Sequence, residues 1–381
     1  MALCIDFTMD LAIFCSGVSN REAPLQPWLT LIEVGRRLAS QGRSVHLVTD
    51  GEQPTDDLPL PVHQLGSLRG TNTAHIQSWI KEHRPEKVIV SVAPFSLATA
   101  HWHASLGKEK SFAYAPYAWY TRQEVVAAWR HLDWRERRNY GRNLVVPRIV
   151  WRRNLEARFS GAICQSKLTA QRLGFHDRAT VIPPGVDLEV WRPSQADSAR
   201  RVSTDTFLFL GAPLAIRGFR VLLEAMAKLS ERVKLRVLAR GTDAQAEAKL
   251  RRELAALHLL ERVSVKGGWL GQEEIRDEIH SALAVVLPFV LVPSELPVSV
   301  LEVIACGTPA IVSDIDGLPA SVGEAGIVVP QANARLLAAE MLALATLPER
   351  QEALRRACLR QRDNYQSWDA AAERWAAALR V

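Results

Sequence analysis

Short apolar runs of strand length alternate along the chain with longer segments whose apolar residues recur at helical spacing. In the first half the apolar runs are residues 11–15, 45–49, 88–92, 112–115, 161–165 and 180–182. Segments 27–40 and 74–83 lie between them and have the spacing of amphipathic helices. Strands and helices in alternation build a doubly wound parallel sheet with helices on both faces. The first half is therefore predicted to be one such domain.

The second half restarts the same alternation after a polar stretch near residues 194–205. Its predicted strands are residues 206–210, 235–239, 263–265, 283–287 and 310–312, and its predicted helices include 219–229 and the apolar segment after Pro297. Gly307 and Pro309 end that segment as helix-stop signals. The sequence thus predicts an α/β protein with two Rossmann-like domains, residues 1–190 and 205–362, joined by a linker at 191–204 and followed by a helix within 363–381.

Glu302 is a carboxylate in the middle of the apolar helix after Pro297. It lies more than a turn from the helix start, so neither capping nor the helix dipole explains it. An unpaired buried carboxylate is costly. Two interpretations stay open from the residues alone: a carboxylate that snorkels or pairs with an arginine, and one held in a cleft to accept two vicinal hydroxyls, as on a ribose.

The residues around Glu302 carry a family resemblance. The run Ser294-Glu295-Leu296-Pro297 leads to Glu302 and then to Gly307-Thr308-Pro309, with Asp314, Gly317 and Pro319 beyond. This pattern resembles the donor-site signature of glycosyltransferase family 4, whose members are retaining, nucleotide-sugar-dependent enzymes of the GT-B fold. The resemblance implies two domains that face a central cleft and a C-terminal helix that crosses back to the first domain. It is strong in the second half of the chain and weak in the first.

The resemblance also implies roles for individual residues. Glu302 falls where the family binds the donor ribose, while the slot of the family's other glutamate is Ser294, so that Glu295, one residue later, is the candidate catalytic carboxylate. Arg217 falls on the second of two basic positions that bind the diphosphate, and Ala212 occupies the first. The predicted donor-binding residues are Gly17, Gly211, Arg217, Arg240, Trp269, Ser294, Leu296, Pro297, Val298 and Glu302. Gly17 lies in a turn whose N–H groups could approach a ligand, and Trp269 lies where the family contacts the base.

A second catalytic position departs from the family. Family members often carry a histidine after the fifth strand of the first domain, and here that place is Pro116 or Tyr117. The hydroxyl of Tyr117 is the candidate replacement. His101 and His103 lie nearby in sequence and are interpreted as surface or core histidines. The chain has no Asp-x-Asp motif and no set of residues with metal-ligand spacing, so we predict no metal and no cofactor besides the nucleotide sugar.

Charge and composition add a candidate surface. The 381-residue chain has a formal net charge of +6, and its five cysteines lack paired spacing, which suits a reducing cytoplasm. Residues 129–158 contain nine arginines, three tryptophans and three acids. Basic and aromatic residues that interleave can bind nucleic acid, but an anionic membrane surface fits this mixture better. No leader and no apolar run of ~20 residues is found. We therefore predict a cytoplasmic protein that docks on the inner membrane face and binds no nucleic acid.

Three functions follow from these features. The first is a retaining glycosyltransferase that moves a sugar from a UDP- or GDP-linked donor to a lipid-linked or polysaccharide acceptor. The second is a degenerate relative that binds a nucleotide sugar without turning it over, which Ala212, the missing histidine and the shifted glutamate favour. The third is a GT-B epimerase or phosphorylase. Donor consumption with and without acceptor separates the first two.

Overall fold

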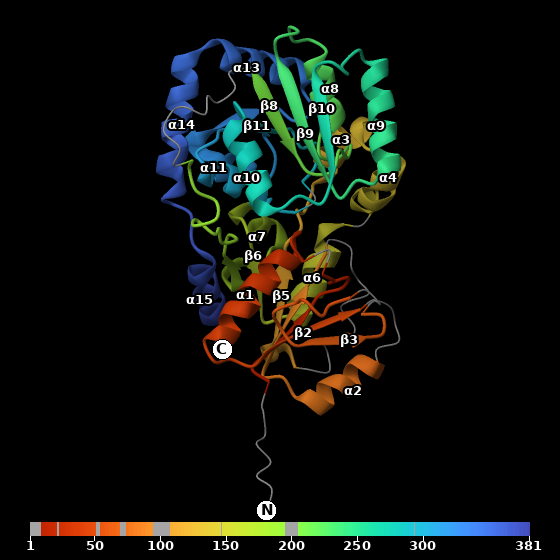
Figure 1. Ribbon diagram of the computed structural model, residues 1–381. Coiled ribbons are helices and arrows are strands. Elements are labelled where there is room, and N and C mark those ends of the chain that lie inside the picture. The colour runs from red at the N-terminus through yellow and green to blue at the C-terminus, as the bar shows by residue number, and fades with distance from the viewer. Residues whose placement is uncertain are drawn as a thin grey trace, which may run out of the picture.

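The computed structural model consists of two α/β halves stacked one above the other (Figure 1). It describes residues 9–20, 23–50, 54–68, 74–93, 107–145, 147–194, 205–292 and 294–381. His101, His103 and most of the predicted linker lie outside these residues. Each half is built on one parallel sheet. The predicted fold class, α/β with two Rossmann-like domains, is confirmed.

The N-terminal sheet has seven parallel strands in the order β3-β2-β1-β4-β5-β6-β7. Its strands are β1 (Leu11–Phe14), β2 (Val45–Asp50), β3 (Val62–Leu65), β4 (Lys87–Ser91), β5 (Ser111–Ala115), β6 (Gly161–Cys164) and β7 (Ala179–Val181). The helices that accompany them are α1 (Trp28–Ser40), α2 (Ala74–His83), α6 (Arg148–Arg158) and α7 (Lys167–Leu173). The central strand β1 is buried along its whole length because helices cover both faces of the sheet.

The C-terminal sheet has six strands in the order β10-β9-β8-β11-β12-β13. They are β8 (Thr206–Leu210), β9 (Lys234–Arg240), β10 (Val263–Gly268), β11 (Val285–Leu287), β12 (Ala310–Ser313) and β13 (Gly326–Val329). The helices are α8 (Phe219–Met226), α9 (Ala244–Ala256), α10 (Gln272–Ser281), α11 (Val298–Ala305), α12 (Leu318–Val322), α13 (Ala334–Thr346) and α14 (Pro348–Arg362). Strand order reverses between β8 and β11, and the carboxyl ends at such a reversal form the usual ligand crevice of an open α/β sheet.

An excursion from the N-terminal half packs onto the C-terminal half. It comprises α3 (Arg122–Ala128), a 3₁₀ turn at Trp129–His131, α4 (Trp134–Tyr140) and α5 (Arg142–Val145). Val125, Ala128 and Leu132 are buried in the same hydrophobic cluster as β8 and β11, and Glu136 accepts a hydrogen bond of 2.9 Å from the backbone N–H of Ile216. Figure 1 shows α3 and α4 beside the C-terminal sheet. By packing, this excursion belongs to the second domain, although its place in the sequence put it within predicted domain 1–190.

The chain returns to the N-terminal half at its end. Helix α15 (Trp368–Leu379) buries Trp375 against Tyr114 of β5, with 5.0 Å between the ring centroids. Figure 1 shows α15 beside α1. Gly185 permits this crossing, because a Cβ at that position would lie 2.6 Å from the backbone of Trp368. The return ties the two halves together independently of the central crevice.

Candidate functional site

Arg217 lies in the loop that follows β8, at the reversal of strand order. Its Nη2 donates a hydrogen bond of 2.8 Å to the carbonyl of Leu210, and its guanidinium lies 5.1 Å from the ring centroid of Phe289. Burial lowers the pKa of Arg217 to about 10. No carboxylate lies within ion-pair distance of it among the residues that the structure describes. Arg217 therefore presents a positive charge that the protein leaves uncompensated.

Two glycines shape the loop that carries Arg217. Gly211 has a φ of 108°, and a Cβ there would lie 2.6 Å from Nη2 of Arg217. Gly218 has a φ of 75°, and a Cβ there would lie 1.7 Å from the carbonyl oxygen of Pro288, just beyond β11. Only glycine fits such close backbone approaches at positive φ. Gly211 therefore makes room for the guanidinium of Arg217, and its predicted part in donor binding stays a prediction.

Glu302 projects from α11 and is half-buried. Burial raises its pKa to about 7, and the nearby Arg240 lowers the pKa again in part. Among the described residues, no lysine or arginine comes within the 4.0 Å of an ion pair with it. The structural ion-pair interpretation of Glu302 is therefore not what the structure shows, and the carboxylate keeps its capacity to accept hydrogen bonds from a ligand.

Arg240 and Trp269 follow neighbouring strands at the same edge. Arg240 ends β9, and Trp269 comes directly after β10, which pairs Gly268 with Arg240. The guanidinium of Arg240 lies 5.3 Å from the ring centroid of Trp269, whose side chain is 46% exposed. The structure thus brings together three of the predicted donor-binding residues, Arg240, Trp269 and Glu302. Arg217 follows the neighbouring strand β8 at the same carboxyl edge.

Glu295 occupies a different setting from the one that the resemblance implies. Its side chain is completely buried at the contact between the two halves, where Oε2 accepts a hydrogen bond of 2.7 Å from the backbone N–H of Gln165. Burial raises the pKa of Glu295 to about 8, and the hydroxyls of Ser166 and Thr169 lower the pKa in part. In this arrangement Glu295 joins the halves and does not open onto solvent.

The loop before α11 is likewise engaged in the contact between halves. The N–H of Glu295 donates to the carbonyl of Pro116 at 2.8 Å, and the N–H of Leu296 donates to Oε1 of Gln165 at 3.1 Å. Ser294 is half-buried, while Leu296, Pro297 and Val298 are buried. The predicted amide donors of Glu295 and Leu296 are therefore occupied. The first turn of α11, where helix N–H groups lack partners within the helix, remains the donor at this place.

The two predicted site residues of the N-terminal half have separate surroundings. Tyr117 is half-buried and lies near Tyr140, whose pKa is raised by burial and, to a smaller extent, by Glu136 and Tyr117. The N–H of Gly17 donates to Oδ1 of Asp50 at 2.9 Å, and the N–H of Val18 next to it donates to Oγ1 of Thr49 at 3.1 Å. The expectation that this turn offers free amides to a ligand is wrong for these two residues, because side chains at the end of β2 already bind them.

Two residues of the contact between halves were not predicted. Gln165, directly after β6, bonds to Tyr114 as well as to the loop before α11. Asp316 has a fully buried side chain, with Oδ1 4.0 Å from Nη1 of Arg172. Burial raises the pKa of Asp316 to about 7. Sequence gives no signal for Gln165, since nothing in its neighbourhood indicates which strand end meets the other domain; Asp316 lay within the quoted signature but in one of its unspecified positions.

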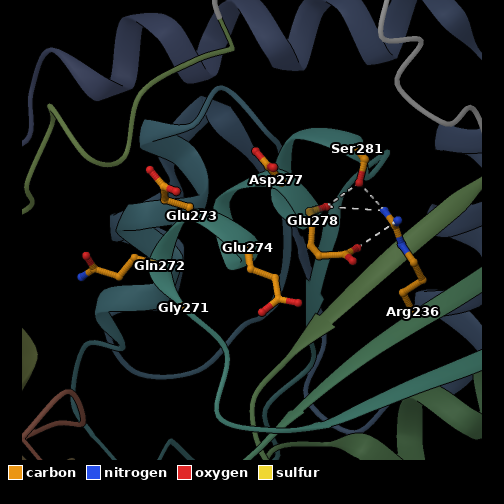
Figure 2. A pocket seen from close by; sticks show the side chains of 8 residues that line it. All are labelled: Arg236, Gly271, Gln272, Glu273, Glu274, Asp277, Glu278 and Ser281. Atoms are coloured by element: carbon orange, nitrogen blue, oxygen red, sulfur yellow. Dashed lines mark hydrogen bonds and ion pairs between the residues drawn. The ribbon is translucent and has the colours of Figure 1, made fainter.

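A cavity of about 840 Å³ lies away from these residues, between α10 and β9. Figure 2 shows its lining, in which Glu278 of α10 reaches Arg236 and binds its guanidinium at 2.9 Å. Glu273, Glu274 and Asp277 line the same cavity, and Arg236 is the one cation among the described residues of the lining. Four acids around one paired arginine would repel a diphosphate. This cavity does not suit the predicted donor.

Comparison with known proteins agrees with the fold. Residues 204–346 match the family model described as glycosyl transferases group 1. The D-inositol 3-phosphate glycosyltransferase of Segniliparus rotundus is 28% identical over 218 residues, 53% of this chain and 46% of the relative. That of Thermobispora bispora is 30% identical over 221 residues, 52% of this chain and 50% of the relative. The chain spans about half the length of these curated relatives.

Solved structures extend the likeness to nearly the whole chain. Sucrose-phosphate synthase of Thermosynechococcus elongatus superposes with a TM-score of 0.76 at 17% identity, covering 98% of each chain. HepE of Anabaena in complex with UDP superposes with a TM-score of 0.74 at 12% identity, covering 98% of this chain and 100% of that one. The fold is of the GT-B type, and residues 204–346 resemble the glycosyl transferases group 1. The predicted resemblance is confirmed. Within the described residues, no helix is both long and apolar enough to cross a bilayer.

Proposed function

We propose that the protein is a retaining glycosyltransferase that transfers a sugar from a nucleoside diphosphate to a lipid-linked or saccharide acceptor. The observation that carries this proposal is Glu302, a half-buried carboxylate without an ion pair, which faces Arg240 at the edge where the strand order reverses. A ribose supplies two hydroxyl donors that such a carboxylate accepts together. UDP in the HepE complex supports a nucleotide donor for this fold.

The residues of the site then divide the work. Arg217 binds the diphosphate because its forked guanidinium suits phosphate oxygens, and the N-terminus of α11 adds amide donors and a positive dipole end. During transfer, the bond from the anomeric carbon to the diphosphate oxygen breaks and a bond to the acceptor oxygen forms. The proton of the acceptor hydroxyl leaves with the diphosphate. Arg217 and the N-terminus of α11 stabilise the negative charge of the departing diphosphate in this scheme. That no metal takes part stays a prediction.

Tyr117 and Glu295 complete the proposal in the N-terminal half and at the contact between halves. Tyr117 offers a hydroxyl on the acceptor side, where other family members often have a histidine. Glu295 acts through domain closure, because its buried carboxyl binds the loop after β6. It is thus a positioning residue in this scheme.

The basic segment 129–158 is proposed to lie against an anionic membrane surface. Within the basic segment 129–158, Trp134 is 65% exposed and Val145 is 75% exposed. The guanidinium groups of Arg135 and Arg138 lie 5.3 and 5.7 Å from the ring of Trp134. Exposed tryptophan flanked by arginine suits the headgroup region of an anionic bilayer. We propose a peripheral association.

The test is nucleotide release from UDP-glucose and from GDP-mannose, each with and without a bacterial total lipid extract. A transferase releases nucleotide faster when the extract is present and labels a lipid with the sugar. A protein that binds either donor yet releases no nucleotide with or without extract would be the degenerate relative. Binding of neither donor would contradict the proposal altogether.

A further inference from the structure

A second guanidinium stands beside Arg217 at the carboxyl edge of the C-terminal sheet. Strands β8 and β9 are parallel, and Leu210 pairs with Leu238. The N–H of Gly211 donates to the carbonyl of Leu238 at 2.9 Å, so the loop that follows β8 begins beside the last residues of β9. Arg240 thus ends its strand beside the loop that carries Arg217. Both cations arise from neighbouring strand ends and reach the same edge.

The guanidinium of Arg240 lacks the partners that a half-buried cation normally has. No carboxylate lies within 4.0 Å of it among the described residues, and its Nε is buried without an acceptor. Burial lowers its pKa, whereas Glu302 raises the pKa in part. Arg236, four residues earlier on the same strand, differs in having Glu278 at 2.9 Å and Ser281 at 2.6 Å. A buried donor left without an acceptor is costly, so Arg240 is poised for one.

Trp269 fixes where that guanidinium lies. The ring stacks under Arg240 at 5.3 Å, an arrangement that attracts the cation but accepts none of its in-plane hydrogen bonds. The N–H groups of Arg240 therefore stay available at the rim of the plane. Their geometry suits two oxygens of one phosphate.

The loop after β8 offers few cations of its own. Residues 211–216 read Gly-Ala-Pro-Leu-Ala-Ile, and Arg217 is its single charged side chain before α8. A diphosphate carries more negative charge than one arginine neutralises. We propose that Arg240 supplies the second positive charge of the diphosphate site, in the place that Ala212 leaves uncharged, with Trp269 holding its guanidinium in position. This inference rests on the proposed donor function.

The competing explanation is that Arg240 only balances the charge of Glu302 across the edge. The two explanations differ in what they predict for a nucleoside. If Arg240 binds phosphate, its loss lowers the affinity for a nucleoside diphosphate and hardly changes the affinity for the nucleoside. If Arg240 only balances Glu302, its loss lowers both affinities equally, since both ligands carry the ribose.

The experiment is calorimetric titration with UDP, UMP and uridine, with GDP, GMP and guanosine in parallel. The variants are Arg240→Gln, Arg240→Gln combined with Ala212→Lys, and Trp269→Leu. Lys249→Gln, an exposed position in the middle of α9, is the control for the loss of one positive charge. Melting temperatures of all variants show whether each is folded.

Arg240→Gln is expected to lower the affinity for the nucleoside diphosphate of the preferred base about tenfold or more, the size of a lost charge-assisted contact. The affinity for the nucleoside should stay within about twofold of the wild-type value. The added Ala212→Lys should restore most of that loss, because it returns a cation to the same edge. Trp269→Leu should lower the affinity for the nucleoside diphosphate, because the guanidinium of Arg240 is no longer held in place. Lys249→Gln should bind all ligands like the wild type.

Equal weakening of diphosphate and nucleoside by Arg240→Gln, or no weakening of either, would overturn the inference while the wild type still binds its nucleotide. A wild type that binds none of the six ligands would instead overturn the proposed function and this inference with it. The two failures are therefore distinguishable in a single data set.

Discussion

The carboxyl of Glu295 accepts a hydrogen bond of 2.7 Å from the backbone N–H of Gln165, and this bond crosses from the C-terminal half to the N-terminal half. Two further bonds reinforce the crossing. Leu296 donates to Gln165, and Glu295 donates to Pro116. The loop before α11, which adjoins the candidate donor site, is therefore also the contact through which the two halves meet. Donor binding and closure of the halves share one segment.

The shared segment makes stability depend on pH. Burial raises the pKa of Glu295 to about 8 from an ordinary value of 4.5, so the folded protein keeps a proton that the unfolded chain loses. Its stabilising contribution is full below the ordinary value and is lost as the pH rises toward 8. Buried Asp316, with a pKa raised to about 7, changes stability in the same direction.

Glu295→Gln removes this titration while it keeps the neutral shape. Between pH 5.5 and pH 8.5, an interval of about three pH units that brackets the raised pKa values, the melting temperature of both proteins is compared. We expect that of the wild type to fall more than that of Glu295→Gln. Glu349→Gln, on the exposed surface of α14, should respond like the wild type. A Glu295→Gln variant with an unaltered pH response would show that the carboxyl does not hold its proton in the folded protein.

Arg217→Ala tests the diphosphate site from its other side. The variant should bind a nucleoside diphosphate more weakly by about 1.5–3 kcal/mol, the size of a lost charge-assisted contact. The free protein should melt only slightly lower, since Arg217 loses its hydrogen bond to Leu210 and its contact with Phe289 but no ion pair within the described part of the chain. Arg220→Ala, on the exposed face of α8 with its side chain 62% exposed, is the control. Unchanged nucleotide affinity in calorimetry would remove Arg217 from the site.

The basic segment predicts association with lipid. The wild type should sediment with vesicles that contain phosphatidylglycerol at low salt, and less at high salt because salt screens the attraction. It should not sediment with pure phosphatidylcholine vesicles, because they carry no net negative charge. Trp134→Ser should reduce the bound fraction several-fold, and each of Arg135→Gln and Arg138→Gln should cost about 1 kcal/mol near an anionic surface. Leu260→Ser, at a 49% exposed residue of the C-terminal half, is the matched control. Binding that ignores both lipid charge and salt would contradict a membrane role.

Much of the fold follows from periodicity. Strand β8 and helix α2 have the predicted bounds, and most other predicted elements differ by a residue or two at their ends. Strands β3 and β13 were not predicted. β3 lies at the edge of its sheet and is only partly buried, so it lacks a continuous apolar run. β13 begins at a glycine and has an exposed residue in its interior.

Sequence could not say which sheet an amphipathic helix covers. Helices α3 and α4 follow the N-terminal strand β5 in the chain, yet Val125 and Leu132 pack into the C-terminal core. The same limit applies to Glu295. Its signature predicted the right segment, but the direction of one side chain depends on how two domains meet, and that geometry is set by residues as distant in sequence as Gln165.

The central claim is that the carboxyl edge of the C-terminal sheet binds the ribose and diphosphate of a donor, and Glu302→Gln tests it most directly. The decisive measurement is calorimetric affinity for the preferred nucleoside diphosphate, taken together with the melting temperature of the ligand-free variant. We expect a loss of about 1–3 kcal/mol in binding, because glutamine keeps the shape but not the charge of the acceptor. The ligand-free melting temperature should hold or rise, since a half-buried carboxylate without an ion pair is replaced by a neutral group. Unchanged affinity with a lowered melting temperature would contradict the donor site and make Glu302 a structural residue.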